Sequence, residues 1–204
     1  KPFLVVVLGL AAALSSTVAH TALNVFACEP EWAALAKELG GDKVSVFQAI
    51  TAQQDVHRVG ARPSLMARAR SADLLVCTGA DLEISWLPLL VRSAGNRKLQ
   101  PRQPGNFAAA DLVVKIEVPA RLDRSEGDVH PYGNPHIHLD PRNVSRIARA
   151  LGQRLAQVDP ANAAHYQGRT GDFLARWEKA IPQWEARGAA LKGMRVVSHP
   201  KDYN

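Results

Sequence analysis

Two histidines and an aspartate alternate with apolar residues in the stretch His136-Ile-His138-Leu-Asp140, which has a proline on either side. Imidazole nitrogens and carboxylate oxygens are the groups that bind zinc and similar divalent ions in proteins. The spacing therefore predicts metal chemistry, either reversible capture of an ion or hydrolysis by a water that the ion activates.

The hydrolytic interpretation depends on all three side chains. The pattern H-x-H-x-D resembles the core of the metallo-β-lactamase-like hydrolases, in which a further histidine follows at the position that Pro141 holds here. Asp140-Pro141 is also typical of a helix start, with Asp140 as the N-cap and proline in the first turn. A zinc-dependent hydrolase that uses His136, His138 and Asp140 is the alternative function.

Two distant histidines favour capture instead. His57 follows one predicted strand and His199 follows another, while His136 lies just before the predicted helix start. In parallel α/β sheets the loops at the carboxyl ends of strands share one crevice. We therefore expect these three imidazoles to converge, whereas His165, on a long predicted helix, is expected to be a surface residue.

Apolar periodicity predicts an α/β fold with a parallel sheet. The first strand, helix and second strand form a β-α-β unit, and a proline opens several of the helices. Pro182 is expected to kink or interrupt the last helix. The expected strands are 23–29, 43–50, 73–79, part of 111–119 and one starting at 195; the expected helices are 31–39, 64–72, 81–93, one from Asp140 and 160–191, with 97–109 as an exposed connection.

The bulk composition fits a globular protein and argues against nucleic-acid binding. The chain has 204 residues, 47% of them apolar, and a formal net charge of +6. Arginines such as Arg146, Arg149 and Arg154 are spread along predicted helix faces and do not form a basic run with interleaved aromatics. We expect a solvated basic surface.

Residues 1–20 have the pattern of a secretory signal peptide. Lys1 precedes an apolar run that ends near Leu14, and small residues surround Ala19. The run is shorter than the roughly 20 residues that a membrane-spanning helix needs. Cys28 lies too far beyond it for a lipid anchor, so we expect a soluble periplasmic protein.

The chain has two cysteines, Cys28 and Cys77, each near the end of an apolar predicted strand. In an oxidising compartment they could form a disulfide. Two small buried thiols fit the same positions, and the sequence leaves both alternatives open.

Residues 23–204 resemble the zinc and manganese solute-binding proteins of ABC transporters, the ZnuA-like family. No single motif carries the resemblance, but their order and spacing do. The matching segments are Asn24-Val-Phe-Ala27, Glu38-Leu-Gly-Gly-Asp-Lys-Val44, Gln54-Asp-Val-His57 with Pro63-Ser64, Ser71-Ala-Asp-Leu-Leu-Val76 with Thr78-Gly-Ala-Asp-Leu-Glu83, Asn134-Pro-His-Ile-His-Leu-Asp-Pro141 and Val196-Val-Ser-His199.

The resemblance implies that His57, His136 and His199 are metal ligands, with a late carboxylate as the fourth. His138 stands where the family commonly has tryptophan, so it is expected to be a neighbour of the site. Val56 replaces the family's usual proline. Three imidazoles favour Zn²⁺, with Mn²⁺ as the alternative cargo.

The resemblance also implies the architecture and the partners. A signal peptide (1–20) would precede an N-terminal α/β lobe (23–158), a linking helix (159–192) and the start of a second α/β lobe (193–204), which we expect to be truncated here. The protein would be no enzyme but a monomeric carrier that delivers its metal to an ABC permease in the inner membrane.

Overall fold

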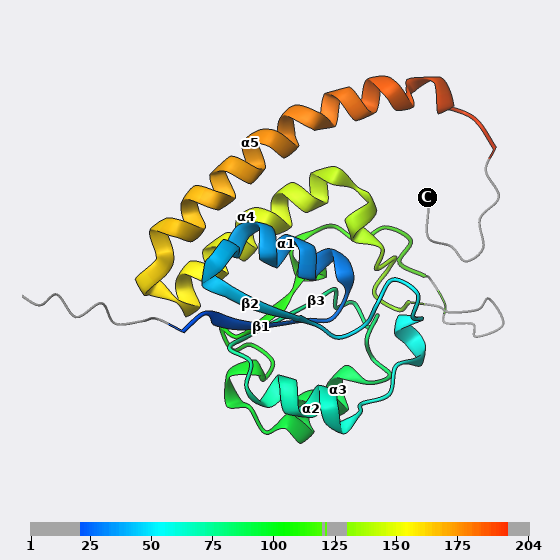
Figure 1. The fold of residues 1–204 in the computed structure, drawn as a ribbon. Helices are drawn as coiled ribbons and strands as arrows, with labels where there is room; N and C mark the ends of the chain where they lie inside the picture. The colour runs from blue at the N-terminus through cyan, green and yellow to red at the C-terminus, as the bar shows by residue number, and fades with distance from the viewer. Residues whose placement is uncertain (1–20, 120, 122–129, 196–204) are drawn as a thin grey trace, which may run out of the picture.

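The structure, a computed structural model, describes residues 21–119, 121 and 130–195. Its centre is a sheet in which each strand runs parallel to its neighbours, in the order β2-β1-β3-β4 (Figure 1). The strands are β1 (Leu23–Ala27), β2 (Val44–Gln48), β3 (Leu74–Cys77) and β4 (Asn106–Ala108). The predicted parallel α/β fold is thereby confirmed. The expected signal peptide, and His199 with the rest of segment 196–204, lie outside the described residues.

Helices cover both faces of the sheet, because alternate side chains of each buried strand point to opposite sides. Val25 and Val76 pack into one apolar cluster, and Phe26 and Leu75 pack into the other. The first cluster lies under α1 (Pro30–Gly40) and α4 (Pro141–Val158), and the second under α2 (Pro63–Arg70) and α3 (Leu87–Ala94) (Figure 1).

Helix α4 begins where the sequence predicts. The Asp140 carboxylate accepts a hydrogen bond from the Arg142 amide at 2.8 Å and so caps the helix. Its apolar stripe, which includes Ile147, Leu151 and Leu155, is fully buried. Burying each such side chain contributes about 1.5–3 kcal/mol, so this stripe fixes α4 on the sheet.

Helix α5 (Ala163–Gly188) packs along α4 and α1 and then extends beyond them (Figure 1). It lies within the predicted range 160–191. Pro182 lies inside the helix without interrupting it, so of the two expected effects, a kink or an interruption, the interruption does not occur. A proline removes one main-chain hydrogen bond and can bend a helix without ending it, and α5 is visibly curved (Figure 1).

Three other predictions about elements are wrong. Residues 81–86 form turns, and α3 starts only at Leu87. Gly79, Ala80 and Asp81 all have positive φ, which excludes a right-handed helix there. Segment 111–119 contains no strand among its described residues; instead, Phe107 anchors β4 within the segment expected to be an exposed connection.

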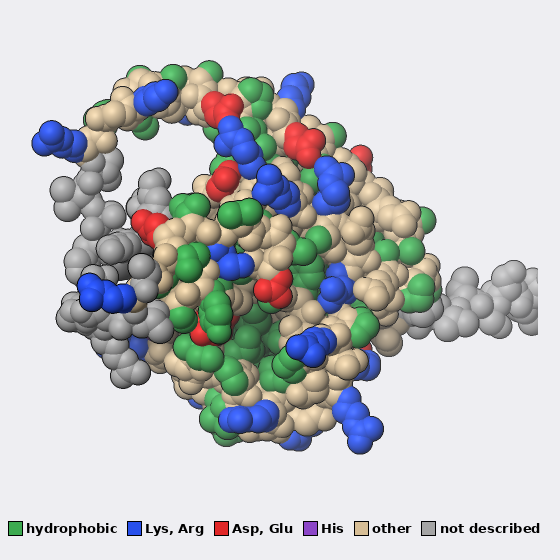
Figure 2. Space-filling view, turned by 180° about the vertical axis from the view of Figure 1, so that it is seen from behind, with side chains coloured by type: hydrophobic (Ala, Val, Ile, Leu, Met, Phe, Trp, Pro, Cys, Tyr) green, Lys and Arg blue, Asp and Glu red, His purple; other side chains and the backbone are tan. Residues whose placement is uncertain are grey.

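The surface agrees with the expectation of dispersed charge. On the face drawn in Figure 2, Lys and Arg side chains are scattered among neutral and acidic residues. Within the described part of the chain, no helix is both long and apolar enough to cross a membrane.

Candidate functional site

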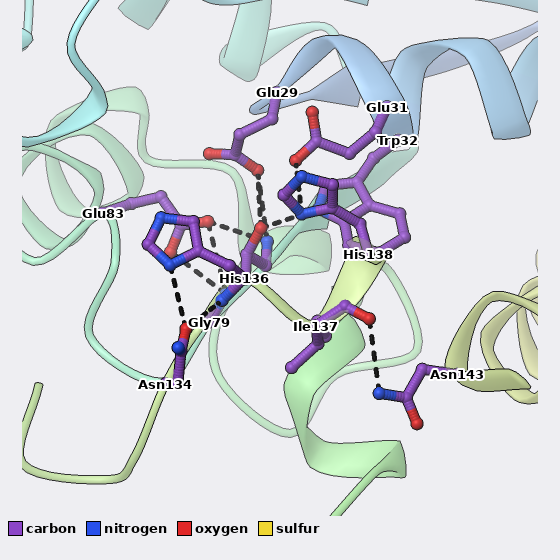
Figure 3. A network of polar contacts seen from close by, with 11 residues as sticks. Glu29, Glu31, Trp32, Gly79, Glu83, Asn134, His136, Ile137, His138 and Asn143 are labelled. Carbon is purple, nitrogen blue, oxygen red and sulfur yellow. Dashed lines mark hydrogen bonds and ion pairs between the residues drawn. The ribbon is translucent and has the colours of Figure 1, made fainter. Parts of the chain in front are cut away.

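His136 lies where the chain enters α4, directly before the short helix η6 (Ile137–Leu139). Ile137 is buried in the apolar cluster beneath α1 and α4, which anchors this segment against the sheet. The His136 side chain is half-buried, and it lies close to the turn after β3 that contains Gly79 and Glu83 (Figure 3).

Asn134 fixes the orientation of the His136 ring. Its Oδ1 atom lies 2.9 Å from the His136 main-chain nitrogen and 2.9 Å from His136 Nδ1. The main-chain N–H can only donate, so the Asn134 atom is an acceptor, and Nδ1 must also carry a proton. The lone pair of the neutral ring then lies on Nε2. Metal-binding histidines usually donate the N–H of their other ring nitrogen to an acceptor in this way.

Four histidine rings form a row beside this segment. The ring centroids of His57 and His130 are 5.2 Å apart, those of His130 and His136 are 6.3 Å apart, and those of His136 and His138 are 6.3 Å apart. Two imidazoles bound to one tetrahedral zinc have centroids about 5 Å apart, given Zn–N bonds of about 2.0–2.1 Å. The spacing of neighbouring rings is therefore close to that in a zinc site, but among the described residues no three histidines bring their ring nitrogens together as a metal group.

His57 enters the row from the loop after β2. It lies in the short helix η2 (Val56–Arg58), and the Asp55 carboxylate accepts a hydrogen bond from the His57 amide at 2.9 Å. This cap fixes the main chain at His57 although the segment is exposed. Val56, which stands where a proline was expected, is compatible with an ordered turn.

His138 and Asp140 have structural neighbours of their own. His138 Nδ1 lies 3.4 Å from Glu31 Oε1, and the ring meets Trp32 edge-on (Figure 3). The Asp140 carboxylate caps α4. The three polar side chains of the H-x-H-x-D stretch therefore have different neighbours, and this arrangement does not support a catalytic metal pair.

A cavity of about 580 Å³ opens beside His136. It is lined by segment 114–116 and by residues between Asn134 and Arg146. Val114 is 80% exposed and Ile116 is 55% exposed, so the wall of this cavity opposite α4 is apolar and open to solvent.

Two buried glutamates, Glu29 and Glu83, follow the carboxyl ends of β1 and β3 and are drawn with His136 and His138 in Figure 3. Glu29 Oε2 accepts a hydrogen bond from the Thr78 hydroxyl at 3.2 Å, and Glu83 Oε1 accepts one from the Thr78 amide at 2.7 Å. Trp32 Nε1 donates to the same hydroxyl at 2.7 Å. Gly79 donates its amide to Glu83 as well. This network holds the turn after β3 in its left-handed conformation.

Burial disfavours the charged form of both carboxyl groups. Burial, followed by the charge of Glu83, raises the pKa of Glu29 well above the ordinary value of 4.5, and burial also raises the pKa of Glu83. The two carboxyl groups also influence each other, because the negative charge of Glu83 disfavours the charged form of Glu29. The main-chain donors at Thr78 and Gly79 stabilise Glu83 as the charged partner.

Sequence reasoning located part of this site. His57 and His136 lie in one row of rings, although their roles as ligands remain predictions, and His199 lies outside the described residues. His130 was missed; its position in the loop before His136 was a signal. His165 was expected on the surface but is half-buried, with Nε2 at 2.9 Å from the Gly40 carbonyl oxygen, because α5 packs against the end of α1.

The structure also decides between a disulfide and two buried thiols. Cys28 and Cys77 form a disulfide between the ends of β1 and β3. The two strands are adjacent and parallel, which brings residues 49 positions apart in the sequence to a Cα–Cα distance of 4.8 Å.

Residues 25–202 match the family described as ZnuA, the periplasmic zinc-uptake complex component A. The match covers most of the sequence, so the chain belongs to this family of metal-binding ABC-transporter components. The resemblance inferred from the ordered motifs is confirmed.

Particular relatives differ in the metals that their names give. The chain is 27% identical over 175 residues to the metal ABC transporter substrate-binding lipoprotein SloC of Streptococcus mutans, covering 84% of this chain and 54% of the relative. It is 27% identical to the manganese ABC transporter substrate-binding lipoprotein ScaA of Streptococcus gordonii (79% and 50% covered) and 26% identical to the iron ABC transporter substrate-binding lipoprotein MtsA of Streptococcus pyogenes (88% and 57% covered). The chain thus spans about half the length of these relatives. They are transport components and not enzymes, in agreement with the expectation for this chain.

Solved structures share the fold. A zinc-bound deletion mutant of ZnuA superposes with a TM-score of 0.65 at 24% identity, covering 80% of this chain and 57% of the other. A manganese-bound periplasmic metal-binding protein from Candidatus Liberibacter asiaticus also gives a TM-score of 0.65, at 19% identity, with 81% and 56% covered. These similarities concern the fold alone.

Proposed function

We propose that this chain is the metal-capturing part of an ABC importer that carries Zn²⁺, with Mn²⁺ as the alternative cargo, outside the cytoplasm. The observation that carries the proposal is the Asn134–His136 pair, which puts the lone pair of the ring on Nε2. A row of imidazoles beside His136 supplies further nitrogen donors.

The ligands in this proposal are His57, His136 and His199. The preference for zinc follows from the donor type, since imidazole nitrogen suits Zn²⁺ whereas Mn²⁺ prefers oxygen ligands. The manganese and iron named for two relatives make the choice of metal a question for direct measurement.

Capture and release require no base or nucleophile from the protein. The metal would pass to a permease of the inner membrane, as the names of the relatives suggest for their own partners. The family description is periplasmic, while several relatives are named lipoproteins. We propose export by residues 1–20 and a soluble periplasmic carrier that acts as a monomer.

Calorimetric titration with Zn²⁺ and Mn²⁺ tests the function. We expect His136→Ala to weaken zinc binding at least about tenfold, which corresponds to 1.4 kcal/mol. His138→Ala is the matched control, because it removes an imidazole from the same segment that faces Glu31 instead. Equal losses in both variants, or no zinc binding by the unmodified chain, would refute the proposal.

A further inference from the structure

A second group of metal-binding side chains lies at the carboxyl ends of β1 and β3. Cys28 directly follows β1, Cys77 ends β3, and both side chains are buried, with exposures of 0% and 3%. The Cys28 amide donates to the Val76 carbonyl oxygen at 2.9 Å, so the main chain keeps the two cysteines side by side independently of their covalent bond.

Glu83 reaches the same point. Its carboxylate oxygen and the two sulfur atoms all lie within 4.8 Å of one another. Among the residues that the structure describes, no other three histidine, cysteine or acidic side chains bring their ligand atoms this close together. Glu83 is 2% exposed, so the group is shielded from water.

Glu29 is a second buried carboxyl group next to Cys28 in the chain. It is 4% exposed. No donor among the described residues reaches its Oε1 atom. Two buried carboxyl groups in contact need a positive charge between them, either a proton or a metal cation. The buried carboxyl groups beside the cysteines therefore favour binding of a cation.

We propose that reduction of the Cys28–Cys77 disulfide opens a buried zinc site, distinct from the histidine row, in which both thiolates and the Glu83 carboxylate bind one Zn²⁺. A dithiol supplies the two electrons: the Cys28–Cys77 bond breaks, the dithiol becomes a disulfide, and its two protons pass to the cysteine sulfurs. Zn²⁺ then replaces these two protons, which are released to solvent.

The donor set selects zinc. Thiolates favour zinc over manganese, and two sulfurs with a carboxylate suit a tetrahedral ion with bonds of about 2.3 Å to sulfur and about 2.0–2.2 Å to oxygen. Glu29 or a water would complete the four ligands. The cysteines pack with α2 and α3, whereas Ile137, beside His136, packs with α1 and α4. The cysteine sulfurs and the His136 segment therefore belong to different apolar clusters of the lobe.

This site gives the disulfide a consequence for transport. A thiolate site binds zinc tightly and a buried site releases it slowly, so a reduced chain would retain one ion that it could not deliver. In an oxidising compartment the disulfide prevents the two cysteines from binding metal, so that only the histidine row exchanges metal.

Cobalt spectroscopy tests the proposal, because thiolate-bound Co²⁺ has a near-ultraviolet charge-transfer absorption that histidine-bound Co²⁺ lacks. The chain is measured oxidised and after anaerobic reduction by a phosphine, with the two thiols confirmed by titration. We expect the reduced chain to bind one more Co²⁺ than the oxidised chain, with the thiolate absorption, and Zn²⁺ to displace it. The same stoichiometry in both redox states, or no thiolate absorption, would overturn the proposal.

Variants separate this site from the histidine row. His136→Ala should keep the thiolate absorption, Glu83→Gln should weaken Co²⁺ binding at least tenfold in the reduced chain only, and the double variant Cys28→Ser/Cys77→Ser should abolish the extra ion. If reduction unfolds the chain, circular dichroism decides: recovery of the helical signal on adding Zn²⁺ supports the site, and no recovery refutes it. Failure of the proposed transport function would instead appear as a lack of zinc binding by the oxidised chain.

Discussion

Trp177 Nε1 donates a hydrogen bond to the main-chain carbonyl oxygen of Pro141 at 2.8 Å. This contact joins the middle of α5 to the first residue of α4, just after the segment that carries His136. Arg142 forms an ion pair with Glu185 one position further along α4. The long helix is therefore attached to the candidate metal segment, and a shift of that segment on metal binding would be transmitted to α5.

Trp177→Phe should lower the free energy of unfolding by about 1 kcal/mol, the usual net contribution of a hydrogen bond. The phenyl ring can keep the stacking on Phe173, whose ring centroid lies 5.3 Å from that of Trp177. Urea denaturation measures the loss. Trp184→Phe is the control, because Trp184 is 40% exposed. A loss as large in Trp184→Phe would show that ring size matters rather than the hydrogen bond.

Asp140→Ala should destabilise the chain by about 1 kcal/mol through loss of the α4 N-cap, with little change in zinc affinity. Asp140→Asn keeps a capping oxygen and should restore most of the stability. Denaturation and calorimetry of the same preparations measure both quantities. A large loss of metal binding in Asp140→Asn would revive the hydrolase-like interpretation of the H-x-H-x-D stretch.

The raised pKa of Glu29 predicts a pH dependence of stability. Since the folded chain raises the pKa of Glu29 above 4.5, its stabilising contribution is fully present below the unfolded value and is lost as pH rises through the folded value. We expect unfolding free energy to fall from about pH 5 towards neutral pH. Glu29→Gln should flatten this decline; an unchanged slope by urea denaturation at several pH values would contradict the assignment.

Gly152→Ala should destabilise the contact between α4 and α5 by about 1–3 kcal/mol, because its Cβ would overlap the Thr170 side chain. Thr170 cannot easily turn away, since its hydroxyl donates to the Tyr166 carbonyl oxygen at 2.7 Å. Gly168→Ala in α5 is the matched control: a Cβ there meets no atom within 4 Å, and better helix propensity should raise stability by about 0.5–1 kcal/mol. Thermal unfolding of both variants should therefore change in opposite directions.

His130→Ala should weaken zinc binding, by less than His136→Ala does, because its ring lies between those of His57 and His136. His165→Ala removes an imidazole that contacts the Gly40 carbonyl oxygen and should leave zinc affinity unchanged. Competition titration against a chromophoric chelator measures both. Unchanged affinity in His130→Ala would limit the metal ligands to the three histidines of the sequence prediction.

The sequence by itself determined the elements whose signals are local. The apolar run that forms β1 and the Asp140-Pro141 helix start depend on neighbouring residues alone and were found. The late start of α3 was not, because the turn before it depends on Glu83 accepting amide hydrogen bonds. Apolar periodicity does not reveal that the Glu83 side chain accepts hydrogen bonds from the nearby amides of Thr78 and Gly79.

Tertiary structure decided which polar groups meet. Glu29 and Thr78, like Cys28 and Cys77, are 49 residues apart in the chain. They meet because β1 and β3 are adjacent strands and end at the same edge of the sheet. Likewise, the His130 ring lies near those of His57 and His136 only because the tertiary structure brings their loops together. Residue types could indicate metal chemistry, but neighbours across strands and loops depend on how the sheet is ordered, which local sequence does not specify.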